Sequence, residues 1–238
     1  MHDLERAARQ SLIDTCIAMN ASGLSLGKSG NASLRWGDGL LISPTGTAYA
    51  QLRPEHIVYL DADGNCPAGQ LLPSSEWRIH CDILRAFPAC EAVVHVHSTH
   101  ATALACLGQE IPPFHYMVAM AGGARIPCAD YATFGTPELS ANVLRALDGG
   151  LRACLMANHG QVAAGKSLAD ALALQRNAYL AQPVPTLEQR KADLRTLQRF
   201  VRENKEALIG AINADYGHRS RHEPLLAEVF PAIDGVDH

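Results

Sequence analysis

The stretch EAVVHVHSTHA, residues 91–101, places two histidines one residue apart inside an apolar run. Its valines are β-branched and fit the pleated surface of a sheet, so the stretch predicts a buried strand. Side chains alternate along a strand, so His95 and His97 would point to one face while Val94 and Val96 point to the other, into a core. Two imidazoles on one face can converge on a single metal ion.

Segments on both sides of this strand alternate between helical and strand patterns. Apolar residues from Leu4 to Met19 recur at helical spacing and stop before Gly23. Several connecting loops are short enough for antiparallel pairing, so the order indicates a layered α/β or α+β domain over residues 1–181. The other predicted strands are 39–46, 56–60 and 153–158, and the other predicted helices are 73–88, 99–108, 136–147 and 167–181.

The overall composition narrows the classes of function. The chain has 238 residues, of which 47% are hydrophobic and 18% charged, so it can bury a sizeable core. Its net charge of −4 gives no general electrostatic case for binding nucleic acid or an anionic membrane. The N-terminal residues are too charged for a signal peptide, and no apolar run approaches a membrane span. Seven scattered cysteines without a C-x-x-C motif are typical of a reducing cytoplasm.

His159, in the stretch MANHGQ, is the third candidate metal ligand. It follows the predicted strand 153–158, and Gly160 behind it would let the backbone turn so that the ring aims back into a cleft. A catalytic zinc site needs three protein ligands and one open position. His95, His97 and His159 would supply those three ligands.

Ordinary structural interpretations of these residues stay open. The H-x-H motif is weak in a chain with eleven histidines, and such a pair can simply be hydrogen-bonded at a sheet edge. We interpret His80, His100 and His115 as hydrogen-bonded residues of that kind. Glu76, in the first turn of the predicted helix 73–88, could be a fourth metal ligand or a general acid/base. It could equally be an acid favoured by the helix dipole.

Two loops rich in glycine and hydroxyl groups are candidates for binding an anion. The loop GKSGNAS, residues 27–33, can turn its N–H groups inward, although it lacks the spacing of a nucleotide-binding P-loop. The stretch SPTG, residues 43–46, is a second turn of this kind, and each alone is typical of an ordinary turn. Together with Ser74 and Ser75, the two loops could surround a phosphate.

Seven motifs agree in order and spacing with one family. They are GNAS, LISPTG, LPSSEWRIH, VVHVHSTHA, FHYMVAMAGG, YATFGTPEL and NHGQVAAG. Over about residues 1–175 the chain resembles the class II aldolases, most closely the L-fuculose-1-phosphate aldolases, in a superfamily that also holds ribulose-phosphate epimerase and the adducin head. The resemblance implies a three-layer α/β/α sandwich with a mainly antiparallel central sheet. It also implies a homotetramer with active sites at the subunit interfaces.

The resemblance further implies a role for each site residue. One Zn²⁺ per subunit would be held by His95, His97 and His159, with Glu76 as a movable ligand and catalytic acid/base. Tyr116 in FHYM matches the tyrosine that acts on the oxygen of the departing aldehyde. Contacts to the substrate phosphate would come from Gly30, Asn31, Ser43, Thr45, Gly46, Ser74 and Ser75.

The implied reaction is retro-aldol cleavage of a phosphorylated ketose such as L-fuculose 1-phosphate, which gives dihydroxyacetone phosphate and a short aldehyde. Epimerase relatives carry aspartate where this chain has Glu76, which favours an aldolase. One alternative is a related zinc-dependent epimerase or sugar-acid phosphate decarboxylase. Another is a binding module like the adducin head, in which the fold persists without catalysis.

Two departures from the family stand out. Lys28 replaces the usual threonine, and it could add charge to the phosphate pocket, alter the preferred substrate or point to solvent. The family's long C-terminal helix and tyrosine-bearing tail are missing, and the helical residues 182–238 resemble instead the N-terminus of a coniferyl aldehyde dehydrogenase. The catalytic cysteine and nucleotide-binding regions of that enzyme are not in this stretch. We therefore expect a zinc-binding aldolase-like domain over 1–181, a helical extension over 182–238, and no dehydrogenase activity.

Overall fold

The computed structural model describes residues 2–113, 116–180, 195, 198–199, 202–206 and 209. The chain divides into two compact units, Met1–Ala181 and Gln182–His238. Among the described residues, all strands belong to the first unit. Most of the helical extension predicted for 182–238 lies outside the described residues, so its role stays a prediction.

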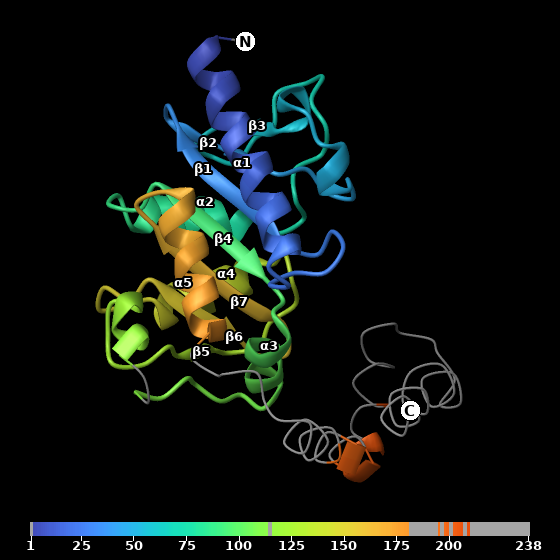
Figure 1. The fold of residues 1–238 in the computed structure, drawn as a ribbon, viewed down its shortest axis with the longest axis vertical. Coiled ribbons are helices and arrows are strands. Elements are labelled where there is room, and N and C mark those ends of the chain that lie inside the picture. The colour runs from blue at the N-terminus through green and yellow to red at the C-terminus, as the bar shows by residue number, and fades with distance from the viewer. Residues whose placement is uncertain are drawn as a thin grey trace. The chain divides into compact units, whose positions relative to one another are not determined.

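A seven-stranded sheet forms the centre of the first unit, in the order β3-β2-β1-β4-β7-β6-β5 (Figure 1). The predicted strand with the paired histidines is β4, the middle strand, and all five of its residues are buried. The strands are β1 Asn31–Trp36, β2 Gly39–Ile42, β3 Val58–Leu60, β4 Ala92–Val96, β5 Cys128–Ala129, β6 Ala153–Met156 and β7 Gly160–Gly165.

The sheet is mixed, which corrects the expectation of a mainly antiparallel sheet. The pairs β1–β2, β2–β3, β1–β4, β4–β7 and β6–β7 are antiparallel, whereas the edge strand β5 runs parallel to β6. The helix α4, Pro137–Ala146, lies between β5 and β6 in the chain. It provides the long crossover connection that parallel pairing requires.

Helices cover both faces of the sheet and create a three-layer arrangement (Figure 1). On one face, α1 (Asp3–Ala21) and α5 (Leu168–Leu180) pack over Val94 and Val96 of β4. On the opposite face, α2 (Trp77–Ala86) and α4 pack over Val93 of β4 and Val162 of β7. The first unit also contains the helix α3, Thr99–Cys106, and the 3₁₀ turns η1 Tyr49–Gln51, η2 Pro54–His56 and η3 Tyr116–Ala121.

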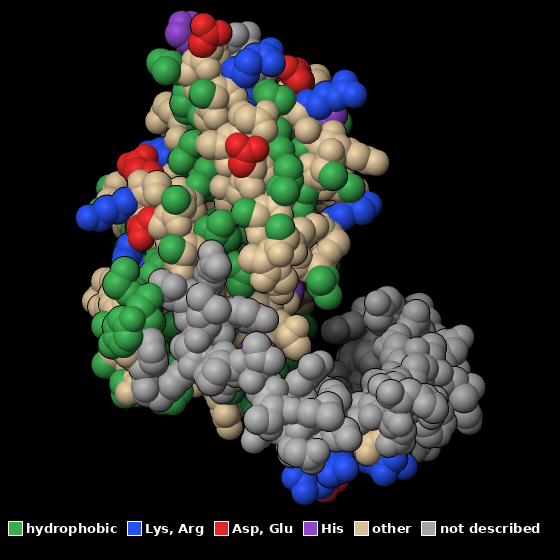
Figure 2. All heavy atoms as spheres, viewed as in Figure 1, with side chains coloured by type: hydrophobic (Ala, Val, Ile, Leu, Met, Phe, Trp, Pro, Cys, Tyr) green, Lys and Arg blue, Asp and Glu red, His purple; other side chains and the backbone are tan. Residues whose placement is uncertain are grey.

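The surface of the first unit carries charges of both signs. On the face shown in Figure 2, basic and acidic side chains are interspersed among hydrophobic and neutral polar ones. Within the described part of the chain, no helix combines the length and apolar character needed to cross a membrane.

Candidate metal centre

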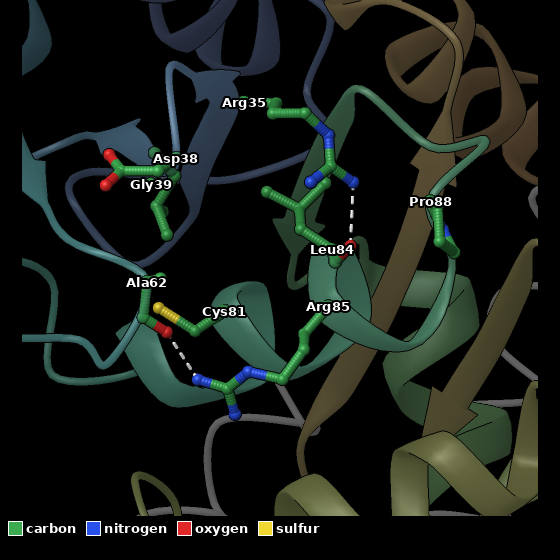
Figure 3. Close-up of a pocket in the computed structure, with 9 residues that line it drawn as sticks. Arg35, Asp38, Gly39, Ala62, Cys81, Leu84, Arg85 and Pro88 are labelled. Atoms are coloured by element: carbon green, nitrogen blue, oxygen red, sulfur yellow. Dashed lines mark hydrogen bonds between the residues drawn. The ribbon is translucent and has the colours of Figure 1, made fainter.

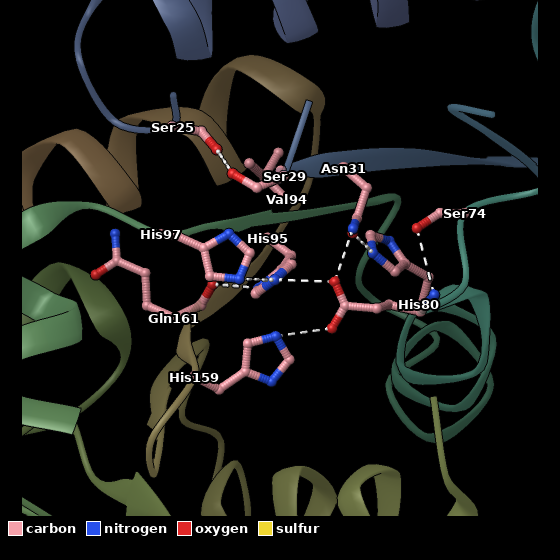
Figure 4. A network of polar contacts seen from close by, with 12 residues as sticks. Ser25, Ser29, Asn31, Ser74, His80, Val94, His95, His97, His159 and Gln161 are labelled. Carbon is pink, nitrogen blue, oxygen red and sulfur yellow. Dashed lines mark hydrogen bonds and ion pairs between the residues drawn. The ribbon is translucent and has the colours of Figure 1, made fainter. Parts of the chain in front are cut away.

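Three histidines and a glutamate converge where β4 ends (Figure 4). They are the four residues predicted as metal ligands: His95, His97, His159 and Glu76. One ligand atom from each lies within 4.8 Å of all the others. His95 belongs to β4 and His97 follows it directly, while His159 comes from the turn between β6 and β7. Segments far apart in sequence thus meet at one point.

Local backbone geometry aims the side chains at this point. The turn that carries His159 contains Asn158 in the left-handed region, with φ of 53°, which asparagine tolerates better than most residues. A Cβ on Gly160 would lie 2.6 Å from the carbonyl oxygen of Val96 and 2.8 Å from Cδ2 of His97. Glycine is therefore needed at position 160 for the close approach of β7 to the His97 ring.

Glu76 occupies the N-cap position just before α2, rather than the first turn of the helix as the sequence pattern predicts. Its backbone N–H donates to Oγ of Ser74 at 3.3 Å, and its side chain makes no capping hydrogen bond. The carboxylate is therefore free of the usual helix-capping role. It turns instead toward the histidines and is buried there, with 6% of the residue exposed.

The distances between ligand atoms fit a small cation. Nε2 of His95 lies 3.2 Å from Nε2 of His97 and 3.1 Å from Oε2 of Glu76. Nε2 of His159 lies 2.9 Å from Oε1 of Glu76. Nitrogen and oxygen ligands at about 2.0–2.2 Å from a tetrahedral zinc ion are separated by about 3.3–3.6 Å. A divalent cation could therefore be held with small adjustments.

The hydrogen bonds around these atoms also leave lone pairs facing one another. Nδ1 of His95 lies 2.9 Å from the carbonyl oxygen of Gln161, which can only accept, so Nδ1 carries a proton. In the neutral ring, Nε2 of His95 then presents its lone pair to the cluster. Oε1 of Glu76 is buried without a well-oriented hydrogen bond, although His159 lies nearby. Converging lone pairs and an unsatisfied carboxylate oxygen fit a divalent cation.

The glutamate and the histidines of the cluster shift one another's pKa values. Burial alone would raise the pKa of Glu76, but the charge of His95 and the polar contacts with His159 and His95 hold it well below its usual range. Burial alone would lower the pKa of His95, but attraction to Glu76 raises it overall. Burial and the charge on His95 lower the pKa of His97 to about 3. The pKa of His97 leaves its ring neutral and ready to bind a metal at neutral pH, whereas the attraction of Glu76 favours the protonated form of His95 and competes with a cation there.

Metal affinity is expected to increase with pH. At pH values below the pKa of His95, which Glu76 raises, a cation must displace a proton from Nε2 of that ring. Below that pKa, the apparent dissociation constant should rise about tenfold for each unit of decrease in pH, and above it the constant should level off. Competition with a chromophoric chelator at several pH values measures this dependence. A dissociation constant independent of pH across the range would contradict the assigned proton.

The segments predicted to contact phosphate lie beside one another. The backbone N–H of Ser74 donates to the carbonyl oxygen of Ser43 at 3.1 Å. Nζ of Lys28 donates to the carbonyl oxygen of Gly46 at 2.9 Å, which joins the loop 27–33 to the turn 43–46. Lys28 thus contacts the second loop rather than only solvent.

The predicted phosphate residues differ in exposure. Thr45, Gly46 and Ser75 are exposed, whereas Gly30, Asn31, Ser43 and Ser74 are buried. Nδ2 of Asn31 donates to Oε2 of Glu76 at 3.0 Å, so its amide is directed at the metal cluster.

Tyr116 begins η3 and exposes 77% of its surface, in contrast to the buried Glu76. Its sequence neighbours Phe114 and His115 lie outside the described residues. His100 lies in α3, and the predicted hydrogen-bonded residue His80 lies buried in α2. The four metal-ligand candidates therefore gather on one chain, whereas Tyr116 stands at its surface.

A separate pocket lies between the β1–β2 hairpin and α2 (Figure 3). The guanidinium of Arg35 donates to the carbonyl oxygen of Leu84 at 2.7 Å, and that of Arg85 to the carbonyl oxygen of Ala62 at 2.5 Å. Burial raises the pKa of the Cys81 thiol to about 12, which leaves it unreactive at neutral pH. Both guanidinium groups therefore hold the backbone, and we assign this pocket a structural role.

Comparison with known proteins adds the family. The family described as Class II Aldolase and Adducin N-terminal domain matches residues 10–178. The 5-methylthioribulose-1-phosphate/5-deoxyribulose-1-phosphate aldolase of Rhodospirillum rubrum is 52% identical over 168 residues, which cover 71% of this chain and 75% of the relative. The L-fuculose phosphate aldolase of Escherichia coli strain K12 is 47% identical over 184 residues, which cover 77% of this chain and 81% of the relative.

A solved structure agrees with these relatives. An L-fuculose 1-phosphate aldolase superposes with a TM-score of 0.70 at 33% identity, covering 77% of this chain and 93% of its own. The enzyme class predicted from the motifs is confirmed, since the relatives are named as aldolases, which are carbon–carbon lyases. The family match ends at residue 178, so the dehydrogenase-like character of residues 182–238 stays a prediction. With its motifs, its fold and its relatives in agreement, the chain belongs to the class II aldolase and adducin N-terminal domain family.

Proposed function

We propose that this chain is a zinc-dependent aldolase that cleaves a ketose 1-phosphate into dihydroxyacetone phosphate and an aldehyde. The observation that carries the proposal is the convergence of three histidines and Glu76 on one point. The relatives named above act on phosphorylated pentuloses or on L-fuculose phosphate. These compounds share a phosphorylated ketose and differ in the part released as the aldehyde. The shared part supports a ketose 1-phosphate as the substrate class of this chain.

His95, His97, His159 and Glu76 would hold one Zn²⁺ per subunit. When bound, the ion supplies Lewis-acid polarisation of the C2 carbonyl and compensates negative charge that develops during cleavage. Glu76 would hold and deliver the proton at the carbon that leaves as part of dihydroxyacetone phosphate. The carboxylate is ionised at rest because its neighbours hold its pKa low, so it would first take up a proton that the substrate releases on cleavage and then deliver it to this carbon.

The loops around Ser43 and Ser74 would bind the phosphate, with Lys28 adding positive charge at their edge. Backbone N–H groups in such turns hold anions well, and an ammonium group strengthens that attraction. Fixing the phosphate orients the ketose carbonyl toward the metal. The hydrogen bond from Lys28 to Gly46 supports this placement of the charge.

Tyr116 would act on the C4 oxygen, which becomes the aldehyde oxygen. Its exposure on one chain suits a residue that reaches the site of a neighbouring subunit. We therefore propose that the enzyme works as a homotetramer with active sites at subunit interfaces. We also propose that it works in the cytoplasm. Exposed apolar side chains that such an interface could cover include Leu26, Leu72, Tyr131 and Phe134.

The function is tested by product analysis. Metal-loaded protein is incubated separately with 5-methylthioribulose 1-phosphate, 5-deoxyribulose 1-phosphate and L-fuculose 1-phosphate. A coupled reductase assay detects dihydroxyacetone phosphate, and mass spectrometry identifies the aldehyde. We expect dihydroxyacetone phosphate from at least one ketose 1-phosphate and none from the unphosphorylated sugars. An epimerised sugar or carbon dioxide as the product, or no conversion of any substrate, would contradict an aldolase.

A further inference from the structure

A buried chain of hydrogen bonds runs from β1 to the candidate acid/base (Figure 4). Nδ1 of His80 lies 2.7 Å from Oγ of Ser33, and Nε2 of His80 lies 2.5 Å from Oδ1 of Asn31. Nδ2 of Asn31 in turn lies 3.0 Å from Oε2 of Glu76. All four residues are buried, with at most 6% of any of them exposed. Neither metal binding nor phosphate binding explains why Ser33, through His80 and Asn31, is linked by hydrogen bonds to Glu76.

The donor and the acceptor in each of these hydrogen bonds follow from the contact between Asn31 and Glu76. Nδ2 of Asn31 donates to Oε2 of Glu76, so the side-chain carbonyl oxygen of Asn31 faces Nε2 of His80. That carbonyl can only accept, so Nε2 of His80 must carry a proton. In the neutral ring, Nδ1 then accepts the hydroxyl proton of Ser33. A single tautomer of His80 satisfies all three contacts.

The strand β1 and the helix α2 hold the residues of this hydrogen-bond network in fixed positions. Asn31 and Ser33 are two residues apart on β1 and share one face, and Asn31 is paired in register with His95 of β4. His80 lies one helical turn beyond Glu76, on α2. A glutamate side chain has three rotatable bonds, so without such support its carboxylate would sample several positions. The chain ties one carboxylate oxygen to the centre of the sheet.

We infer that His80 and Asn31 are positioning residues for Glu76: His80, acting through Asn31, fixes Oε2 as the permanently hydrogen-bonded oxygen and leaves Oε1 as the oxygen that exchanges protons with substrate. This inference rests on the proposed acid/base role of Glu76. It also gives the Asn31 side chain a task different from phosphate binding. Displacements of about 1 Å in a reacting group can cost about 10²-fold in rate, so the support has a measurable effect.

The first test compares two replacements of His80. Gln at position 80 can place an N–H near the site of Nε2, whereas Leu fills similar space without a donor. We expect His80→Leu to lower kcat about 10- to 10²-fold, with KM within about twofold and one metal ion still bound per chain. We expect His80→Gln to retain kcat within about threefold. Full activity in folded His80→Leu, or equal loss in both variants, would overturn the inference.

A matched control addresses general damage to α2. Oγ of Ser140, a buried residue of α4, donates a hydrogen bond of 2.7 Å to the partly buried Asp82 of α2, and this contact does not involve Glu76. Ser140→Ala should therefore leave kcat and KM unchanged while it reduces the thermal unfolding temperature slightly. A fall in kcat in this variant equal to that in His80→Leu would show that any loosening of α2 has the same effect, and would overturn a specific positioning role.

The role of Asn31 is separated from phosphate binding by inhibition with inorganic phosphate. We expect Asn31→Ala to lower kcat and to leave the inhibition constant for inorganic phosphate unchanged within about twofold. An inhibition constant raised about tenfold or more, with kcat unchanged, would assign the side chain to the phosphate and contradict the inference.

A readout independent of activity separates this inference from the proposed function. Nitrogen-15 NMR of the histidines in the metal-loaded protein should show the Nε2–H tautomer for His80, assigned by its loss in His80→Gln. A wild-type protein without aldolase activity but with this tautomer would refute the proposed function and leave the hydrogen-bond chain standing. The Nδ1–H tautomer would overturn the chain even in an active enzyme.

Discussion

Replacing His97 with alanine is expected to remove the bound metal and to lower kcat/KM at least about 10³-fold. Nε2 of His97 faces Nε2 of His95 at 3.2 Å, so its loss leaves an incomplete ligand set. A catalytic site needs three protein ligands to hold zinc firmly, and substrate activation depends on the ion. His97 suits this test because its ring is only partly buried, so the packing cost is small. Metal content by plasma mass spectrometry and turnover of a ketose 1-phosphate measure the two effects.

The matched control is a histidine outside the cluster. His56 lies in η2, where Nδ1 accepts a hydrogen bond from the backbone N–H of Arg53. His56→Ala should retain one metal ion per chain and normal turnover. If His97→Ala also retained both, His97 would not be a ligand.

Replacing Glu76 with glutamine is expected to preserve the metal and to lower kcat about 10²- to 10⁴-fold. The amide keeps the size of the side chain and can still accept from Asn31, but it cannot take up a proton. The three imidazoles remain to hold the ion. The same change should also lower the pKa of His95, because burial opposes its protonation and the attraction to Glu76 is lost.

The comparison for this variant is a surface carboxylate. Glu110 forms an ion pair with Arg125 at 2.9 Å, with both side chains largely exposed. Glu110→Gln should leave metal content and kcat unchanged, since exposed pairs contribute little. A Glu76→Gln protein that turns over at the normal rate would rule out proton transfer by this carboxylate. One that loses its metal would show that Glu76 acts mainly as a ligand.

Much of the site could be predicted because it follows from regular geometry. The period of two along β4 placed His95 and His97 on one face, and the structure has them there. The sequence also predicted His159 at the end of a strand. Gly160 is needed because its backbone lies close to Val96 and the His97 ring, rather than to allow a turn. The residue types and spacing of these candidate ligands were therefore enough to predict that they lie together.

Other parts of the fold had no clear local pattern. Residues 31–33 belong to the predicted loop GKSGNAS, yet they begin the strand β1 because its backbone pairs with both β2 and β4. The small residues of GQVAAG give β7 a weak strand signal, although the strand is buried throughout. The two-residue strand β5 is too short for any pattern to predict, so the parallel pairing was missed. Each of these strands depends on partners distant in sequence.

The support of Glu76 was hidden for the same reason. His80 was interpreted as an ordinary hydrogen-bonded histidine, and its bonding partners are 47 and 49 residues away. Its spacing of four from Glu76 on a helix is the one local sign that the two share a face. The loop composition and the resemblance both indicate a phosphate contact for Asn31, and only the folded structure shows its hydrogen bond with Glu76.

Metal removal and stepwise restoration test the core of this account most directly. Protein stripped with a chelator should produce no dihydroxyacetone phosphate from a ketose 1-phosphate above background. Activity should return in proportion to added Zn²⁺ and reach its plateau at one ion per chain, with an X-ray absorption spectrum that shows three imidazole nitrogens around the ion. Stripped protein that cleaves the substrate at the full rate, or a restored ion bound without imidazole ligands, would contradict it.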